Sequence, residues 1–274
     1  MNNFITIDEI TDFGLNTLST EVAPTVPPHF HNHYEIMYFI KGDAYYMVEG
    51  NNYELSDGDL LITNPRELHC PVFKSKKPYQ RTIITIKPSF LSDFITESYS
   101  PFYSLDKRNL GSQNRISCDL VKKYKIDEKF KEIEYWRNKE SRESLIMIKA
   151  SLIQLLVTLN NIVLQENPTG KTSNIDMVLQ YINRHLTEKI SLTALEEEFH
   201  LSKYHIAHSF REKTGLTVME YITKKRLVLA KELILEGLSL NEAADKVGFS
   251  DYSNFYRSFK KTMGFSPKDL RRLV

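Results

Sequence analysis

The last third of the chain contains the same helix-turn-helix pattern twice, and this repeat constrains the fold more than any other feature. Ser191 opens the first copy, and Ser239 opens the second 48 residues later. In each copy a serine N-cap, a turn around His200 or Gly248, and a glycine after the second helix predict two short helices joined tightly. Further positions match, with the offset becoming 49 residues after one insertion: Leu201-Ser202 and Phe249-Ser250, Tyr204 and Tyr252, Ser209-Phe210 and Ser258-Phe259, Gly215 and Gly264.

Residues 191–215 and 239–264 are therefore predicted to be two helix-turn-helix units. Each pair of helices is too small to bury its own core, so a third helix is needed. A preceding helix is predicted by apolar residues at i, i+3, i+4 and i+7, which are Ile175, Val178, Leu179 and Ile182. Residues 219–235 predict a connecting helix ~25 Å long, which with its turns separates the units by close to one DNA repeat, ~34 Å. Both units are then expected to enter successive major grooves.

The second helix of each unit has an apolar and a polar face. Ile206 and Phe210 face inward in the first unit, and Phe255 and Phe259 do so in the second. Arginine reads guanine bidentately, whereas lysine and hydroxyl groups hold phosphates. An ordinary solvated helix face is the alternative, which the tandem repeat disfavours. The predicted DNA-binding residues are Lys203, Tyr204, Ala207, His208, Arg211, Tyr252, Ser253, Tyr256, Arg257 and Lys260, with Arg257 the first choice for a base contact.

The net charge of +1 alone argues against a nucleic-acid partner. Divided at Lys171, however, the chain carries −3 before this residue and +4 from it onward. Residues 251–274 hold six basic and two acidic residues. DNA contact is therefore expected to concentrate in this segment, with moderate non-specific affinity.

The N-terminal part predicts a β-rich domain followed by helices. Up to about residue 87, short runs of Tyr, Ile, Val and Phe alternate with turn signals, as in an antiparallel barrel or sandwich, and the turn 49–52 predicts a hairpin. The predicted organisation is a β-barrel domain with following helices (1–165, barrel about 1–87, helices about 88–165), a linker (166–174) and an all-α DNA-binding domain (175–274).

A heptad-like apolar stripe runs along the predicted helix 145–164. It has two readings, which the sequence leaves open: the stripe packs on the β-domain of its own chain, or it forms a dimer interface with a second chain. Its residues are Leu145, Ile148, Leu152, Leu155, Leu159 and Ile162.

A group of histidines and a glutamate is predicted to alternate along one strand and so to share one face. His29, His31 and Glu35, followed by Gly42, resemble the first cupin motif, and 58–69 resembles the second, except that Glu67 stands where glycine is usual. A metal site formed by His29, His31, Glu35 and His69 is one lower-ranked alternative, and buried or surface histidines with no ligand are the other. The favoured interpretation is an effector pocket without metal, formed by His29, His31, His33, Glu35, Tyr38, Tyr46, Arg66 and His69, with Tyr34 as a further candidate.

The C-terminal segment 190–271 resembles the DNA-binding region of AraC/XylS-type transcription regulators. The resemblance rests on the run Gly248-Phe249-Ser250-Asp251-Tyr252-Ser253-Asn254-Phe255-Tyr256-Arg257-Ser258-Phe259-Lys260-Lys261, and on Gly264-Phe265-Ser266-Pro267 followed by Leu270-Arg271. It implies base contacts from the outward residues of both second helices and a cupin-like barrel that binds a small effector. Ala207 and His208 depart from the usual pattern, so the first helix is the weaker reader.

We therefore expect a cytoplasmic homodimeric regulator of transcription, an activator rather than a repressor, that acts with RNA polymerase, needs no cofactor and is not an enzyme. A carbohydrate is the effector most often implied by the resemblance, and an aromatic or organic acid stays open. The alternatives are a metal-dependent cupin enzyme with an appended binding module, and a pure interaction protein. The location follows from two cysteines without a CxxC pair, a start unlike a signal peptide, and a segment 145–164 that looks too polar to span a bilayer.

Overall fold

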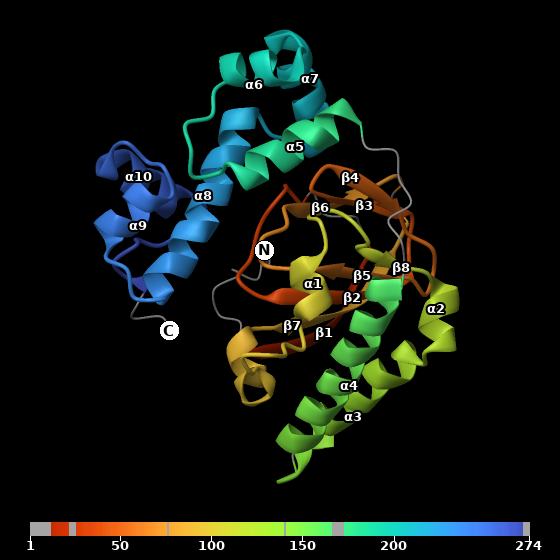
Figure 1. Ribbon diagram of the computed structural model, residues 1–274. Coiled ribbons are helices and arrows are strands. Elements are labelled where there is room, and N and C mark those ends of the chain that lie inside the picture. Colours follow the sequence, from red (N-terminus) through yellow and green to blue (C-terminus); the bar gives the residue numbers. More distant parts are fainter. Residues whose placement is uncertain (1–11, 22–25, 76, 140, 166–172, 271–274) are drawn as a thin grey trace. The chain divides into compact units, whose positions relative to one another are not determined.

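The computed structural model describes residues 12–21, 26–75, 77–139, 141–165 and 173–270 (Figure 1). The chain divides into two compact units, Met1–Thr169 and Gly170–Val274. Most of the linker prediction, 166–172, lies outside the described residues, as do residues 1–11 and Arg271. Each unit is described by itself below.

The first unit is built on two antiparallel sheets, with strand orders β1-β7-β2-β5-β8 and β4-β3-β6. The prediction of a β-rich N-terminal fold followed by helices is thereby confirmed. The strands are β1 Phe13–Thr20, β2 Tyr34–Lys41, β3 Ala44–Val48, β4 Asn51–Glu54, β5 Leu60–Thr63, β6 His69–Phe73, β7 Tyr79–Ile86 and β8 Arg115–Ile116.

Strand β2 is buried on both faces, and its alternation assigns each side chain to one of two cores. Met37 and Phe39 pack with Tyr46 and Val48 of β3, so the two sheets meet face to face. Ile36 points the opposite way, into the core that the large sheet shares with helices. Residues of β2 with odd numbers therefore face the space between the sheets.

The hairpin between β3 and β4 has a two-residue turn, Glu49-Gly50, inside the predicted segment 49–52. Both residues have positive φ, 50° and 81°. This conformation matches the right-handed twist of a short hairpin, and glycine adopts it without a side-chain clash.

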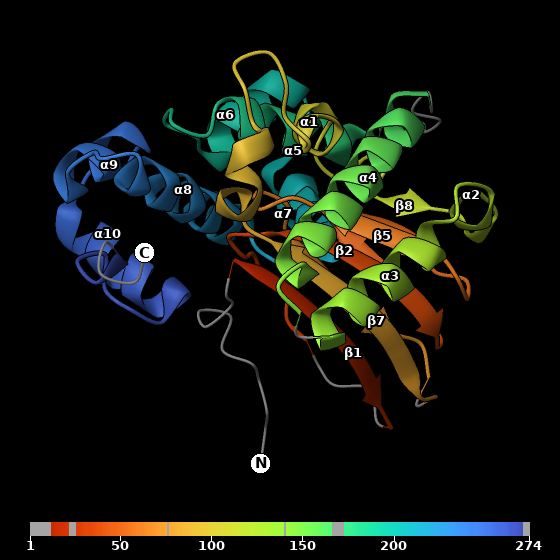
Figure 2. The ribbon, with the colours of Figure 1, turned by 90° about the horizontal axis from the view of Figure 1, so that it is seen from below.

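Helices cover the outer face of the five-stranded sheet (Figures 1 and 2). They follow the strands in the chain, apart from β8: η2 Pro88–Phe94, a 3-10 helix, then α1 Tyr103–Lys107, α2 Cys118–Lys123, α3 Ile126–Lys139 and α4 Ser144–Gln165. Helix α4 is long and apolar enough to cross a membrane by length and composition, which corrects the prediction that it is too polar. Leu152, Leu155 and Leu159 are fully buried in the core beneath the sheet, which is the position of a core helix in a globular protein.

The second unit is all helical and contains both predicted helix-turn-helix units. Its helices are α5 Asn174–Arg184, α6 Leu192–Phe199, α7 Lys203–Thr214, α8 Val218–Leu235, α9 Leu240–Lys246 and α10 Tyr252–Met263. Ser191 and Ser239 cap α6 and α9 by accepting backbone N–H hydrogen bonds, and Glu242 completes the predicted capping box. Gly215 and Gly264 end the recognition helices α7 and α10 in the left-handed region.

The two helix-turn-helix units are tied together by Arg226 of the connecting helix α8. Its guanidinium donates hydrogen bonds to the carbonyl oxygens of Leu186 and Glu188, before the first unit, and of Gly248, in the turn of the second. Gly248 has a φ of +85°, and a Cβ here would lie 2.7 Å from the Thr187 carbonyl oxygen. This close approach requires glycine. The turn at Gly248 and the Arg226 side chain therefore fix how the two helix-turn-helix units are oriented relative to each other.

Candidate functional sites

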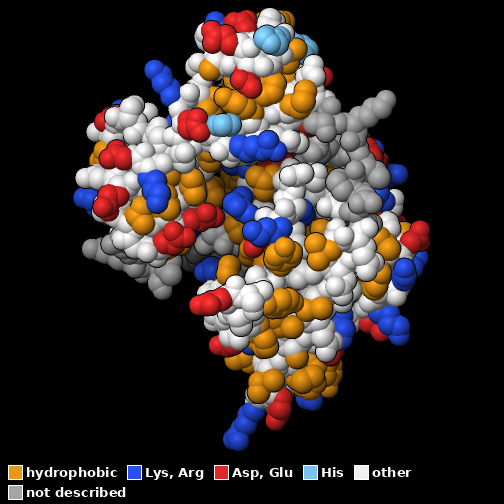
Figure 3. All heavy atoms as spheres, in the orientation of Figure 1, with side chains coloured by type: hydrophobic (Ala, Val, Ile, Leu, Met, Phe, Trp, Pro, Cys, Tyr) orange, Lys and Arg blue, Asp and Glu red, His pale blue; other side chains and the backbone are white. Residues whose placement is uncertain are grey.

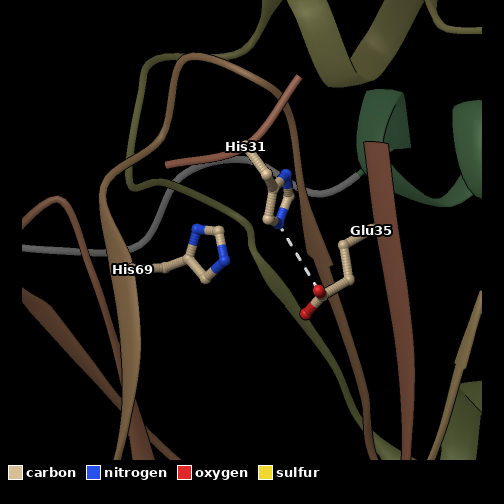
Figure 4. Close-up of side chains that lie close together, drawn as sticks. All are labelled: His31, Glu35 and His69. Carbon is tan, nitrogen blue, oxygen red and sulfur yellow. Dashed lines mark ion pairs between the residues drawn. The ribbon is translucent and has the colours of Figure 1, made fainter. Parts of the chain in front are cut away.

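Three buried side chains converge at the end of the space between the two sheets (Figure 4). Glu35 comes from the second residue of β2, His31 from the bend before it, and His69 from the first residue of β6. An isolated bridge between His29 and His69, with hydrogen bonds of 3.1 Å in both directions, brings the two segments together. We call His31, Glu35 and His69 the His–Glu cluster.

The prediction that His29, His31, His33 and Glu35 alternate along one strand is wrong, because β2 begins only at Tyr34. The backbone bends here, and the His31 ring donates through Nδ1 to the carbonyl oxygen of His33, at 2.9 Å. The rings of His31 and His33 stack at 3.8 Å, and the ring of His29 lies 4.6 Å from that of His69. Three of the predicted effector residues, His31, His33 and His69, therefore lie close to Glu35, and His29 lies beside His69. A bend and strand β6, rather than one strand, bring them together.

The charge state of the His–Glu cluster follows from its burial and its neighbours. Burial opposes ionisation of Glu35, yet its interaction with His31 and the nearby His69 and His33 together hold its pKa well below the ordinary value. Burial, followed by the charges of His29 and His31, lowers the pKa of His69 well below 6.5. At neutral pH the cluster thus presents a carboxylate and a neutral imidazole at His69.

Of the other predicted effector residues, Tyr46 lies at this site and two do not. The Tyr46 ring is 6.0 Å from that of His69, and burial followed by the charge of Glu35 raises its pKa well above 10. Tyr38 instead faces α3, where its ring lies 5.6 Å from Phe130, because it is three residues from Glu35 on the same strand.

Arg66 and Tyr34 are likewise placed away from the His–Glu cluster. Both meet Asp106 beside α1: the Arg66 guanidinium lies 3.8 Å from its carboxylate, and the Tyr34 hydroxyl donates to it at 2.8 Å. The inclusion of Tyr38 and Arg66 in the effector set is therefore corrected.

Glu67, the residue at which the chain departs from the cupin motif, holds the loop that presents His69. Its carboxylate accepts hydrogen bonds of 2.7 and 2.6 Å from the Arg108 guanidinium, both groups being fully buried. Its backbone carbonyl oxygen accepts from Nδ1 of His69 at 2.9 Å. A buried glutamate at this position was the signal for such a pairing, but nothing in the sequence identified Arg108 as its partner.

The recognition helices α7 and α10 present the predicted DNA-binding residues on their outer faces. Tyr204 is 79% exposed, and its ring stacks near that of His208 on the next turn. Exposed in the same way are Lys203, Arg211, Ser253, Arg257 and Lys260, whereas Ala207, Tyr252 and Tyr256 are half-buried. Ile206, Phe210, Phe255 and Phe259 are fully buried, as predicted.

The two recognition helices begin differently. Asp251 caps α10 by accepting from the backbone N–H groups of Ser253 and Asn254, at 3.1 and 2.8 Å. At the start of α7, the ammonium of Lys203 lies 3.4 Å from the carboxylate of Glu196. Lys203 is thus already paired with an acidic group, while Arg257 is exposed in a helix with Lys260 and Lys261 in its last turn.

The stripe on α4 belongs to the core of its own chain. Ile148, Leu152, Leu155, Leu159 and Ile162 are between 0% and 7% exposed and pack with the large sheet. These five residues therefore pack on the β-domain of their own chain, and the prediction that they form a dimer interface is corrected. Leu145 is the exception, at 55% exposure.

Comparison with known families and proteins is consistent with this division. The AraC-like ligand binding domain matches residues 22–120, and a helix-turn-helix domain matches residues 195–273. The chain is 25% identical over 232 residues to the uncharacterized HTH-type transcriptional regulator YbfI of Bacillus subtilis, covering 83% of this chain and 80% of YbfI.

Two further similarities cover most of the chain. It is 24% identical over 252 residues to the HTH-type transcriptional activator RhaS of Escherichia coli O1:K1, which covers 90% of this chain and 87% of RhaS. A solved structure of ToxT from Vibrio cholerae aligns with 96% of this chain and 99% of its own, at 17% identity and a TM-score of 0.42.

Proposed function

The chain belongs to the AraC-type transcriptional regulators with a ligand-binding domain, and on this basis we propose how it works: a small effector binds between the sheets of the first unit, and α7 and α10 read the operator. The observation that carries the proposal is the pair of capped recognition helices with polar outer faces. The relatives are transcriptional regulators rather than enzymes. The similarity to RhaS, a transcriptional activator, supports the proposal that this chain activates transcription. Action in the cytoplasm with RNA polymerase as partner is part of the same proposal.

Within the reading surface, Arg257 is the proposed base-reading residue. It is exposed, lies on the outer face of α10, and has a guanidinium whose fork matches a guanine edge. Tyr204, His208 and Arg211 of α7 supply the second set of contacts. The paired Lys203 is assigned to phosphate, where a point charge suffices.

The test is fluorescence anisotropy of the full chain on duplexes from its own promoter region, at several salt concentrations. Arg257→Ala is expected to weaken specific binding by about 1–3 kcal/mol and to relax preference at one base pair. Lys246→Ala is the matched control, since this exposed lysine lies on α9 rather than on a recognition helix. If both variants keep the wild-type preference, the assignment of Arg257 is wrong, and absence of duplex binding at low salt removes the DNA-reading proposal.

The effector site is proposed at the His–Glu cluster together with His29, His33 and Tyr46. Their buried polar atoms suit a small polar ligand such as a carbohydrate or an organic acid. A thermal-shift screen of the full chain detects binding as stabilisation by RT ln(1 + [L]/Kd). A ligand whose stabilisation persists in His69→Gln and Tyr46→Phe would not bind here.

A second face of α4 supports a homodimer with residues other than those first predicted. Ile146, Ile153, Val157 and Leu164 are spaced by seven, four and seven residues and form a stripe on the outer side of the helix. Ile146, Val157 and Leu164 are exposed, whereas Ile153 is half-buried against the core of its own chain, and Figure 3 shows apolar surface over this part of the unit. Because monomers rarely leave a contiguous apolar stripe in water, a second copy of this chain is the proposed occupant.

Sedimentation equilibrium of the full chain tests the dimer. Val157→Glu is expected to weaken association by at least tenfold. Gln154→Glu adds the same charge at an exposed position about 60° around the helix and should leave association unchanged. A wild-type chain that stays monomeric at micromolar concentration removes this proposal without affecting DNA reading.

A further inference from the structure

The His–Glu cluster leaves three buried polar atoms facing one another without a hydrogen-bond partner among the described residues. They are Nε2 of His31, Oε1 of Glu35 and Nε2 of His69. The residues that carry them are 7%, 8% and 0% exposed. Unpaired buried polar atoms cost free energy, so three of them in one place indicate that something is bound there.

The tautomers of the two histidines are fixed from outside the cluster. Nδ1 of His31 lies 2.9 Å from the carbonyl oxygen of His33, and Nδ1 of His69 lies 2.9 Å from that of Glu67. A carbonyl oxygen only accepts hydrogen bonds, so both Nδ1 atoms carry a proton. In the neutral rings each Nε2 therefore has a bare lone pair, and both lone pairs point toward the carboxylate (Figure 4).

This arrangement is the one that orients histidine ligands of a metal ion. A ligating histidine typically donates its other ring N–H to a backbone carbonyl or a carboxylate, which fixes the direction of the ligating nitrogen. Both cluster histidines have that support, and Glu67 is itself anchored by Arg108.

The distances also fit. Nε2 of His31 and Oε2 of Glu35 are 3.4 Å apart, and the ligand atoms of the three residues all lie within 4.8 Å of one another. Ligand bonds of about 2.0–2.1 Å at a tetrahedral angle separate neighbouring ligand atoms by about 3.3 Å. The separation between Nε2 of His31 and Oε2 of Glu35 already matches this spacing.

A single added proton cannot provide a partner for all three unpaired atoms of the His–Glu cluster, whereas one metal ion can bind all three. Protonation of His31 would pair it with Glu35, but Nε2 of His69 would still face them as an acceptor without a donor. A divalent ion instead contacts all three atoms and offsets the charge of the carboxylate.

We propose that the first unit binds one divalent transition-metal ion of the Zn²⁺, Co²⁺ or Ni²⁺ class through His31, Glu35 and His69, with a fourth position open to a donor atom of the effector. Two imidazoles and one carboxylate suit these ions, whereas Mg²⁺ and Ca²⁺ prefer ligand sets made of oxygen. The part concerning the effector rests on the effector site proposed above, and the binding of the ion does not.

The test is a titration of the chelator-treated full chain with Co²⁺, followed by visible absorption. The expected result is saturation at about one ion per chain, with the absorption of a four- or five-coordinate site. Zn²⁺ should displace the signal, and elemental analysis of the Zn²⁺-loaded, dialysed protein should give about one equivalent. A stoichiometry below about one tenth, or a spectrum of hexa-aqua Co²⁺ only, overturns the proposal.

Two variants and one matched control locate the ion. His69→Gln and Glu35→Gln should each weaken Co²⁺ binding by about 100-fold or more, beyond the effect of losing an outer hydrogen bond to a ligand. His205→Gln removes an exposed imidazole from the second unit, outside the three ligands, and should bind normally. Equal loss in all three variants, or in none, contradicts the assignment. Should a variant not fold, the wild-type spectrum still decides.

The outcomes separate this inference from the effector proposal. Co²⁺ binding with no small molecule found in the screen sustains the metal site and removes the effector site. A sugar or acid that stabilises the chelator-treated chain as strongly as the Zn²⁺-loaded chain, without Co²⁺ binding, does the reverse.

Discussion

Glu67 and Glu35 are both buried glutamates of the first unit, and their surroundings are opposite. The carboxylate of Glu67 accepts five hydrogen bonds: two from Arg108, and one each from the backbone N–H of Asn64, the backbone N–H of Gly111 and Nδ2 of Asn114. The carboxylate of Glu35 faces His31 at 3.4 Å and has an unpaired Oε1 within the described part of the chain. One carboxylate is fully used by the fold, while the other is left for a ligand.

The largest expected change in the free energy of unfolding is that caused by substitution of Glu67. Glu67→Gln leaves the Arg108 guanidinium buried without a counter-charge, so the free energy of unfolding should fall by about 3–5 kcal/mol. Urea denaturation followed by circular dichroism measures this change. The control is Glu54→Gln, whose carboxylate pairs with Lys74 at the surface and should change little. A loss of less than about 1 kcal/mol in Glu67→Gln would show that the pair does not hold the loop.

The pH dependence of the chelator-treated chain is the next largest effect. Because the pKa of His69 is lowered in the folded state, the unfolded chain takes up a proton below about pH 6.5 and the folded chain does not. The groups facing this imidazole are His29, His31 and Glu35. Stability is therefore fully present above pH 6.5 and should fall by about 1 kcal/mol between pH 6.5 and 5.5.

His69→Gln removes this contribution, so its stability should vary less over the same pH range. Glu35 does not add to the slope there, since its lowered pKa gives a contribution that is lost only as pH falls below about 4.3. Equal slopes for wild type and variant would contradict the neutral buried state of His69.

The smallest expected change in stability is that of Glu35→Gln, and it contrasts most directly with Glu67→Gln. Glu35→Gln makes the same substitution as Glu67→Gln, but the new amide can donate to Nε2 of His31 or of His69, which the carboxylate cannot. In the chelator-treated chain we expect a change within about 1 kcal/mol, toward higher stability. A loss comparable to that of Glu67→Gln would mean that Glu35 serves the fold in the same way.

The C-terminal unit could be predicted from the sequence in detail because its signals are local. The Ser239 hydroxyl accepts a hydrogen bond from a backbone N–H three residues later in the chain. Gly264 ends its helix because glycine adopts a positive φ without help from other residues. The inward positions of α7 and α10 follow from helical spacing alone. The role of Arg226 could not be predicted from the sequence. Its partners lie near residue 187 and at Gly248, and no spacing pattern indicates that these residues meet.

The N-terminal errors have two different causes. Tyr38 does not share a face with Glu35, because side chains three residues apart on a strand point to opposite faces, and the sequence spacing alone shows this. The stripe of α4 was not decidable, because periodicity shows that Leu152 and Leu155 must be covered but not by what.

The sequence by itself determined the tandem helix-turn-helix architecture, the helix caps and the residue types of a polar site, because these depend on interactions within a few residues. Only the tertiary structure decided that His31, Glu35 and His69 converge, that Glu67 pairs with Arg108, and that α4 turns its predicted stripe inward. Those outcomes depend on strand pairing and packing between distant segments, and no local hydrogen bond or propensity specifies which distant segments meet.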